Sequence, residues 1–210
     1  KTTSSSTRAS QKKKIKDKIL KVALKLFQTH GFHQTTTKML AKEAGIAEGT
    51  IYNYFASKED LALYFYEKEI EKVIKKYHAD EDLQEAPLNE KLFALIHMQL
   101  EHLLPYEDFI HAAFIKALDP RSRLNPLSID AQVHSVKYIK FIKDLFDQAY
   151  KKHEVPNMGD AGPYMFATYY YGMLYYWLRD QSPDKQQSFA MLNRSLELGF
   201  SFLRKGSWSW

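Results

Sequence analysis

The spacing of apolar side chains along the chain predicts helices and no strands. Between residues 11 and 30 the apolar positions recur at steps of three and four residues, the period that places them on one face of a helix. No stretch shows the alternation of β-branched residues that is typical of a strand. We therefore expect an all-α fold of about nine helices, over residues 11–30, 38–44, 48–54, 58–78, 88–104, 106–118, 127–152, 163–179 and 184–205.

Glycines and hydroxyl-bearing residues mark the ends of the first helices. Gly31 and Gly45 follow apolar periodic segments, where glycine favours a left-handed cap. Thr36 or Thr37 can cap the second helix, because a hydroxyl accepts from the free amides of a first turn. Ser57 is placed to cap the fourth helix in the same way. The acidic stretch 79–87 is expected to be a loop.

The last two predicted helices have more apolar surface than one chain of this size can bury. Residues 161–178 carry no charge, but they include two glycines, a proline and six tyrosines. We interpret them as a buried protein helix and expect no membrane partner. The helix 184–205 carries two apolar stripes. A two-fold interface of four helices would cover both, so we expect a homodimer. Its interface is predicted at Tyr169, Gly172, Tyr176, Leu192, Leu196, Gly199 and Phe200.

Charge is distributed unevenly along the 210 residues. The first 60 residues hold 12 Lys and Arg and 5 Asp and Glu, a net charge of +7, whereas the remainder has a net charge of −2. This asymmetry favours a polyanionic partner at the N-terminal end, with a solvated basic tail as the alternative. The chain has no cysteine and shows no secretory signal, so we expect a cytoplasmic protein without disulfides or cysteine-type zinc sites.

The segment from Thr36 to Phe55 predicts a helix-turn-helix. Two short helices flank a turn that contains Gly45, and apolar residues such as Leu40 and Ile51 hold them together. The outward positions carry small, hydrogen-bonding and aromatic side chains, which suit entry into a DNA major groove. They are Glu48, Gly49, Thr50, Tyr52, Asn53 and Tyr54.

A longer sequence segment that includes this motif identifies a protein family more specifically than the helix-turn-helix alone. Residues 31–61 read GFHQTTTKMLAKEAGIAEGTIYNYFASKEDL, which closely resembles the N-terminal domain of the TetR/AcrR family of bacterial repressors. They contain the family's glycine–aromatic pair, paired threonines, Ala-Gly-aliphatic turn, Gly-Thr-aliphatic-Tyr helix and Ser-Lys-Glu-x-Leu segment. The resemblance covers about 50 residues, including the preceding helix. The rest of the chain is similar to the family only in length and helical character.

The resemblance implies a transcriptional repressor that binds a palindromic double-stranded DNA operator as a homodimer. Glu48 departs from the family pattern, in which many members carry serine or another small residue. Its carboxylate can accept from a cytosine amino group or interact with the helix dipole, and we favour the second role. Met39 stands where the family often has an acidic residue, so a capping box is absent there. The positions that match the family's DNA contacts are Thr36, Thr37, Lys38, Gly49, Thr50, Tyr52, Asn53, Tyr54 and Lys58.

The resemblance also implies a small-molecule inducer. In the family, helices between the DNA-binding head and the dimer interface hold the inducer pocket, and ligand entry moves the fourth helix. In this chain those helices are rich in aromatic residues, which suggests an apolar or aromatic ligand. Aromatic residues at helical spacing are also typical of an ordinary core. The candidate pocket residues are His97, Gln99, Phe114, Tyr138, Phe141 and Tyr170.

Two other functions stay open from the sequence. One is a helical DNA-binding architectural protein without inducer control, and the other is a helical binding or catalytic protein whose helix-turn-helix no longer binds DNA. An enzyme is disfavoured, because the chain has no cysteine nucleophile and no glycine-rich phosphate loop. His97 and His102 do not share a helical face, which makes them a poor metal pair. We expect no catalytic residue, metal site or cofactor.

These patterns predict four segments. We expect a disordered basic tail over residues 1–10, a helix-turn-helix domain over 11–56, a helical ligand-binding and dimerisation domain over 57–205, and a frayed end over 206–210. The first 16 residues carry six positive charges and no negative one. They either follow DNA phosphates, enter a minor groove or remain solvated.

Overall fold

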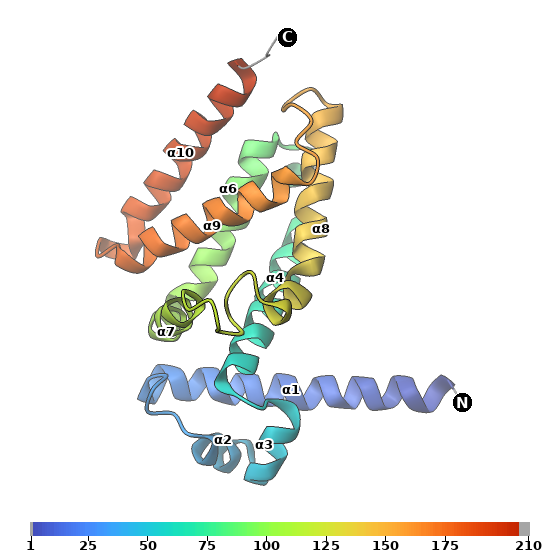
Figure 1. Ribbon diagram of the computed structural model, residues 1–210, viewed down its shortest axis with the longest axis vertical. Helices are drawn as coiled ribbons and strands as arrows, with labels where there is room; N and C mark the ends of the chain where they lie inside the picture. Colours follow the sequence, from blue (N-terminus) through green and yellow to red (C-terminus); the bar gives the residue numbers. More distant parts are fainter. Residues whose placement is uncertain (1, 206–210) are drawn as a thin grey trace. The chain divides into compact units, whose positions relative to one another are not determined.

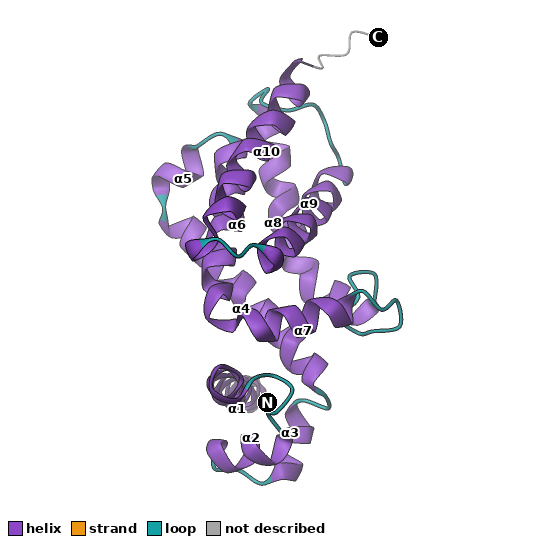
Figure 2. Cartoon of the chain, turned by 90° about the vertical axis from the view of Figure 1, so that its left-hand side faces the viewer, coloured by secondary structure: helices purple, strands orange, loops and turns teal. Residues whose placement is uncertain are grey.

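The computed structural model describes residues 2–205, with side chains described from residue 10 to residue 203. Its regular structure is entirely helical, and no strand occurs in this part of the chain (Figure 1, Figure 2). The all-α prediction is therefore confirmed. The helices are α1 (Thr2–His30), α2 (Thr37–Ala44), α3 (Glu48–Tyr54), α4 (Lys58–Ala79), α5 (Glu81–Glu85), α6 (Leu88–Leu103), α7 (Glu107–Ala117), α8 (Ile129–Lys151), α9 (Ala161–Arg179) and α10 (Gln186–Lys205), with short 3-10 turns at Leu104–Tyr106 and Pro183–Lys185.

The helix ends near the N-terminus follow the predicted capping chemistry. Gly31 and Gly45 have positive φ angles of 79° and 64°, which an L side chain adopts only with strain. The Thr36 hydroxyl accepts from a backbone amide in the first turn of α2 at 3.2 Å. At the start of α4, the Ser57 hydroxyl accepts from the Asp60 amide, and the Asp60 carboxylate accepts from the Ser57 amide. This reciprocal pair is a capping box.

Two helical segments differ from the prediction. Helix α1 begins at Thr2, whereas the apolar pattern predicted a start at residue 11. Adding residues to an existing helix needs no new nucleus, so a polar segment can extend one. The short helix α5 lies in the stretch predicted as a loop, where the Asp80 carboxylate caps it by accepting from the Leu83 amide at 2.9 Å. The predicted frayed end, residues 206–210, lies outside the described residues.

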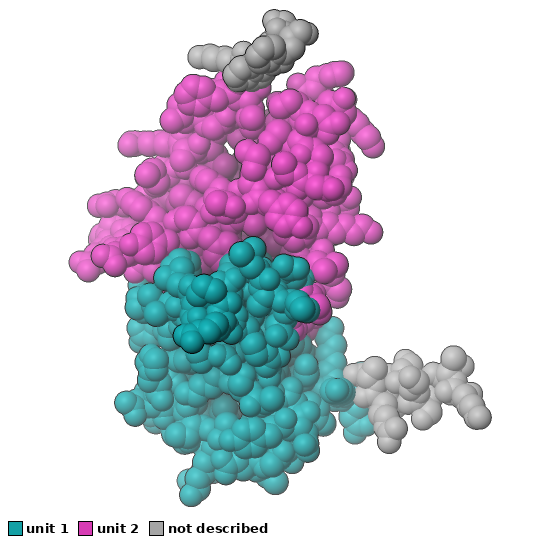
Figure 3. All heavy atoms as spheres, in the orientation of Figure 1, with its two compact units in different colours: residues 1–66, 105–132 teal, residues 67–104, 133–210 magenta. Residues whose placement is uncertain are grey.

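The chain divides into two compact units (Figure 3). The first comprises residues 1–66 and 105–132, and the second comprises residues 67–104 and 133–210. Helices α4 and α8 contribute residues to both. The helix-turn-helix belongs to the first unit, together with the start of α4 and the whole of α7. The domain boundary predicted at residue 56 stays a prediction.

The core of the first unit fixes α2 and α3 on α1. Ile19 of α1, Leu40 of α2 and Ile51 of α3 are almost completely buried. Phe109 of α7 stacks on Phe27 of α1, with ring centroids 4.9 Å apart. Buried apolar contacts of this kind supply most of the stability of short helices. The outward face of α3 is therefore held by a packed core and not by the helix alone.

The core of the second unit gathers around α6. Leu95 and Ile96 of α6, Trp177 of α9 and Leu192 of α10 have no more than 1% of their surface exposed. At the start of α9, a Cβ atom on Gly162 would lie 2.9 Å from the ring of Phe146. Only glycine allows this approach of α9 to α8.

No helix within residues 2–205 is long and apolar enough to cross a membrane.

Candidate nucleic-acid interface and ligand cavity

The helix-turn-helix exposes a polar surface at the N-terminus of α2 and along α3. Lys38 and Asn53 are exposed, and Tyr52 has 52% of its surface exposed. Ile51 anchors the opposite face of α3 in the core. Every DNA-contact residue that the sequence suggested is exposed or half-exposed, and we call this set the recognition surface. It comprises Thr36, Thr37, Lys38, Glu48, Gly49, Thr50, Tyr52, Asn53, Tyr54 and Lys58.

Three residues of the recognition surface are hydrogen-bonded to one another. The Thr37 hydroxyl donates to Oε1 of Glu48 at 2.9 Å. The same hydroxyl oxygen lies 3.1 Å from the Tyr52 hydroxyl. Glu48 occupies the first turn of α3, where a carboxylate also interacts favourably with the helix dipole. The sequence did not predict this link between α2 and α3, because no spacing rule relates residues on two different helices.

Lys58 makes two contacts inside the first unit. Its ammonium donates to the Phe32 carbonyl at 2.8 Å and lies 4.7 Å from the centre of the Phe32 ring. Burial, and secondly the charge of Lys116, lowers the pKa of Lys58 from its ordinary value. The side chain therefore ties the start of α4 to the link between α1 and α2. Its predicted contact with phosphate stays a prediction.

Helix α1 adds positive charge beside the helix-turn-helix. Lys14, Lys18 and Lys21 are exposed and recur at steps of four and three, which places them on one face of α1. The same stripe continues to Lys25, whose ammonium pairs with Glu43 of α2 at 2.7 Å. This concentration of cations in the first unit supports an anionic partner.

The interior of the second unit contains a polar pair among aromatic rings. Gln99 of α6 and Tyr138 of α8 are buried and hydrogen-bonded through the Gln99 side-chain amide and the Tyr138 hydroxyl. The Tyr138 ring lies 6.3 Å from that of Phe141 and 6.0 Å from that of Phe166. Among the described residues, Oε1 of Gln99 and Nε1 of Trp177 have no hydrogen-bond partner. Such unpaired atoms can bind polar groups of a ligand.

The predicted pocket residues are only partly brought together. Tyr170 is a buried residue of α9, one turn beyond Phe166, whose ring lies 6.0 Å from that of Tyr138. Burial raises the pKa of Tyr170. His97 instead lies 4.4 Å from the ring of Phe189. Phe114 is a buried residue of α7 and belongs to the first unit. The candidate ligand site in the second unit therefore keeps Gln99, Tyr138, Phe141 and Tyr170.

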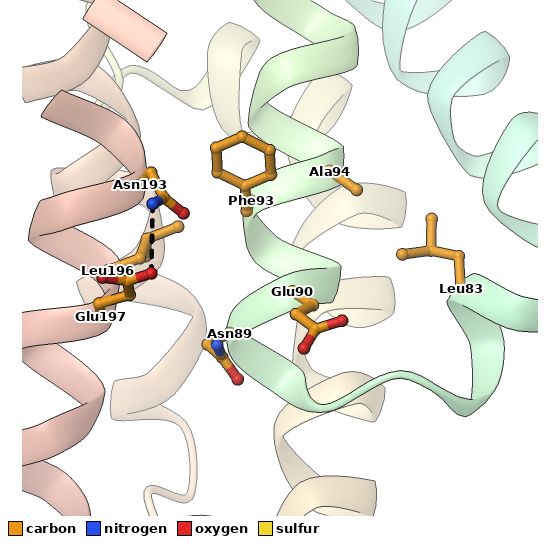
Figure 4. Close-up of a pocket in the computed structure, with 8 residues that line it drawn as sticks. All are labelled: Leu83, Asn89, Glu90, Phe93, Ala94, Asn193, Leu196 and Glu197. Atoms are coloured by element: carbon orange, nitrogen blue, oxygen red, sulfur yellow. Dashed lines mark hydrogen bonds between the residues drawn. The ribbon is translucent and has the colours of Figure 1, made fainter. Parts of the chain in front are cut away.

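A separate cavity of about 270 Å³ opens between α5, α6 and α10 of the second unit (Figure 4). Phe93 of α6 and Asn193 of α10 both line it, and the Asn193 amide donates to Glu197 at 3.2 Å. None of its lining residues was predicted as a ligand contact, and Leu196 was predicted for the dimer interface, since the lining comes from three helices with no shared spacing. They are Leu83, Asn89, Glu90, Phe93, Ala94, Asn193, Leu196 and Glu197.

Helices α9 and α10 expose apolar side chains that the chain itself leaves uncovered. The predicted interface residues divide between this surface and the core. Gly172, Tyr176 and Gly199 are exposed, whereas Tyr169 is half-buried and its hydroxyl lies 2.6 Å from that of Ser195. Leu192, Leu196 and Phe200 are buried within the unit. The exposed apolar face of α9 and α10 consists of Tyr164, Met165, Tyr175, Tyr176, Met191, Leu198 and Phe202.

No group of three or more histidine, aspartate or glutamate side chains in the described part of the chain is arranged to hold a metal ion.

Comparison with known proteins identifies two family models. Residues 19–65 match the model of bacterial regulatory proteins of the tetR family. Residues 91–209 match that of a tetracyclin repressor-like C-terminal domain. The first match contains α2, α3 and the start of α4. The second extends from α6 beyond the end of α10.

Two relatives from Bacillus subtilis match this chain over shorter segments than the two family models together. The fatty acid metabolism regulator protein of Bacillus subtilis is 32% identical over 78 residues, which are 37% of this chain and 39% of that protein. The uncharacterized HTH-type transcriptional regulator YerO of the same organism is 34% identical over 109 residues, 51% of this chain and 38% of that protein. The matches thus span less than two fifths of either relative.

A solved structure matches over most of the chain. The regulator FadR from Bacillus subtilis, in complex with stearoyl-CoA, has a TM-score of 0.65 and 23% sequence identity, covering 88% of this chain and 97% of that one. At this identity the similarity shows a shared fold.

Proposed function

The chain belongs to the TetR family of bacterial regulatory proteins, and we propose that it is a homodimeric repressor that binds a palindromic operator and is released by a small-molecule inducer. The observation that carries the proposal is the recognition surface. Its side chains lie at the N-terminus of α2, which favours a phosphate, and along the exposed face of α3, which fits a major groove.

The proposed roles of the recognition residues follow from their positions. Thr36, Thr37 and Lys38 surround the start of α2 and contact phosphates. Asn53 is exposed on α3 and contacts base edges, because its amide offers both a donor and an acceptor. The Lys58 ammonium donates one hydrogen bond to the Phe32 carbonyl, and its remaining hydrogens contact phosphate. These contacts fix both the orientation of α3 and its sequence preference.

Dimerisation is proposed through the exposed apolar face of α9 and α10. Leu198 and Phe202 of α10 expose 59% and 67% of their surfaces, and Tyr175 of α9 exposes 52%. Exposed apolar side chains gathered on two successive helices are typical of an interface. A two-fold axis beside Gly172 and Gly199, which have open space around them, would pair two copies of the chain, and a palindrome needs two copies of α3 to be recognised.

The inducer site is proposed inside the second unit, around Gln99 and Tyr138. Buried aromatic rings surround Tyr138, and Oε1 of Gln99 has no hydrogen-bond partner, a combination that suits a small-molecule site. Because a structurally similar regulator holds stearoyl-CoA, we propose long-chain acyl-CoA thioesters as the ligand class. The apolar interior suits an acyl chain, and an unpaired side-chain atom of Gln99 would bind a polar group near it. Helix α4, which has residues in both units, would transmit the change.

We further propose that the protein has no catalytic activity and acts in the cytoplasm, where operator DNA is found.

Selection of duplexes from a random pool tests DNA binding. We expect an enriched palindrome, and the variant Asn53→Ala should lose preference at one base position by about 5- to 150-fold. Asn157→Ala, an exposed asparagine of the second unit, serves as the control and should leave the preference unchanged. A protein that enriches no sequence at low salt would contradict the proposal.

Titration of the selected complex with acyl-CoA tests the inducer. We expect stearoyl-CoA to release the duplex, whereas coenzyme A alone does not. Gln99→Leu should weaken this release because it removes the polar atoms of the site, while Asn193→Leu at the separate cavity should not. If DNA binds selectively but no acyl-CoA of any length releases it, the ligand class is wrong and the DNA-binding proposal stands.

A further inference from the structure

The hydrogen bonds among Thr37, Glu48 and Tyr52 have a defined direction. A threonine hydroxyl has one hydrogen, and that of Thr37 is donated to Oε1 of Glu48. The contact of 3.1 Å between the Thr37 and Tyr52 hydroxyls therefore takes its hydrogen from Tyr52. The chain runs from Tyr52 to Thr37 to the carboxylate, and both hydroxyls are directed toward one negative charge.

This arrangement matters because phosphate oxygens and carboxylate oxygens are both anionic acceptors. A phosphate at the start of α2 needs the Thr37 hydrogen that Glu48 already holds. Binding would break a charge-assisted hydrogen bond before making another, and would leave the carboxylate close to a phosphate of the same sign. Glu48 is exposed, so water and salt screen part of this repulsion, and the cost of binding falls mainly on the hydrogen bond that is broken.

We propose that the Glu48 carboxylate is an internal substitute for a DNA phosphate, which holds the Thr37 and Tyr52 hydroxyls in the free protein and lowers its affinity for every duplex. The inference rests on the proposed function, in which these hydroxyls contact DNA. Glu48 thereby sets the strength of binding and not the base preference. In the competing role the same carboxylate accepts a hydrogen bond from a cytosine amino group, which predicts that its removal weakens binding only to duplexes with that cytosine.

The variant Glu48→Gln tests the inference. Glutamine keeps the shape and the acceptor oxygen but removes the charge, so the hydroxyls are released to phosphate more readily. We expect binding about tenfold tighter, both to the selected duplex and to an unrelated duplex of equal length. Asp108→Asn, an exposed carboxylate of α7 outside the network, removes the same charge and should change the affinity less than twofold.

A double-variant cycle tests the role of the hydroxyl. Thr37→Val removes the hydrogen while retaining the shape, so Glu48→Gln should give a clearly smaller gain in that background, where only the screened repulsion remains to be relieved. An equal gain in both backgrounds would overturn the inference, as would unchanged affinity in the single variant. A loss confined to duplexes with one particular cytosine would overturn it in favour of base recognition. Thermal unfolding confirms that each variant is folded.

The outcomes separate this inference from the proposed function. Failure of the unaltered protein to bind any duplex selectively refutes the function and with it the inference. Selective binding by the unaltered protein, with no gain in Glu48→Gln, refutes the inference alone.

Discussion

Replacing Asp180 by asparagine should destabilise the second unit by about 2 kcal/mol at neutral pH. Asp180 follows α9 and is 7% exposed. One carboxylate oxygen accepts from the amide and hydroxyl of Ser182 at 2.8 and 2.7 Å. The other accepts from the amide and hydroxyl of Ser188 at the same distances. The carboxylate thus closes the turn that sets α10 against α9, the two helices of the proposed dimer face.

The magnitude follows from the pKa of Asp180. Burial by itself raises that pKa, but the hydrogen bonds from Ser182 and Ser188 outweigh burial and lower it from the ordinary 3.8 to about 2. A difference of nearly two pH units corresponds to about 2 kcal/mol of folding free energy. Because the folded pKa is depressed, this stabilisation is complete above the unfolded value near 4. It is lost as the pH falls through about 2.

Asparagine has only one acceptor oxygen, so one of the two serine amides loses its partner. Urea unfolding at a series of pH values measures the effect. The free energy of unfolding should differ between Asp180→Asn and the unaltered protein by about 2 kcal/mol at pH 6, and the difference should shrink as the pH falls from about 5 to 2. Asp119→Asn, an exposed carboxylate paired with Arg121, is the control and should change stability far less. If the two proteins have the same free energy of unfolding at pH 6, or if their difference does not change with pH, the reasoning is refuted.

Further expectations concern the helix-turn-helix and the dimer. Lys58→Ala should reduce the log–log salt slope of DNA binding by about one, and an unchanged slope would restrict Lys58 to its contact with Phe32. Phe202→Glu should weaken dimerisation at least about tenfold in sedimentation experiments. Leu127 is an exposed apolar residue of the first unit, and Leu127→Glu should not weaken dimerisation. Equal effects of the two variants would argue against the proposed face. Gly45→Ala should lower the free energy of unfolding by about 1 kcal/mol, because its φ of 64° is strained for alanine and no atom crowds the site; an unchanged stability would contradict this.

Part of the recognition surface was predictable because its signals are local. The caps at Thr36 and Ser57 and the left-handed turn at Gly45 depend on residues within a few positions, and each was found where expected. The exposed face of α3 followed from helical periodicity, with Ile51 buried on the opposite side. The hydrogen-bond chain through Glu48 was not predictable, since it joins two helices whose separation depends on the core beneath them.

The larger domain was predicted less well for the same reason. Apolar periodicity identified the stripes of α10 but not which of them faces inward, and Leu196 proved buried while Leu198 is exposed. Phe114 and Tyr170 were grouped as pocket residues from their chemistry, yet they lie in different compact units. Composition alone does not distinguish an aromatic residue of a ligand site from one of an ordinary core.

By itself, therefore, the sequence determined the helices, their caps and the family of the helix-turn-helix, because helical period, capping and turn chemistry act over a few residues. Only the tertiary structure decided which stripe is buried, which polar atoms remain unpaired and where Lys58 and Glu48 find their partners. Those outcomes depend on side chains far apart in sequence that meet only when the cores have packed.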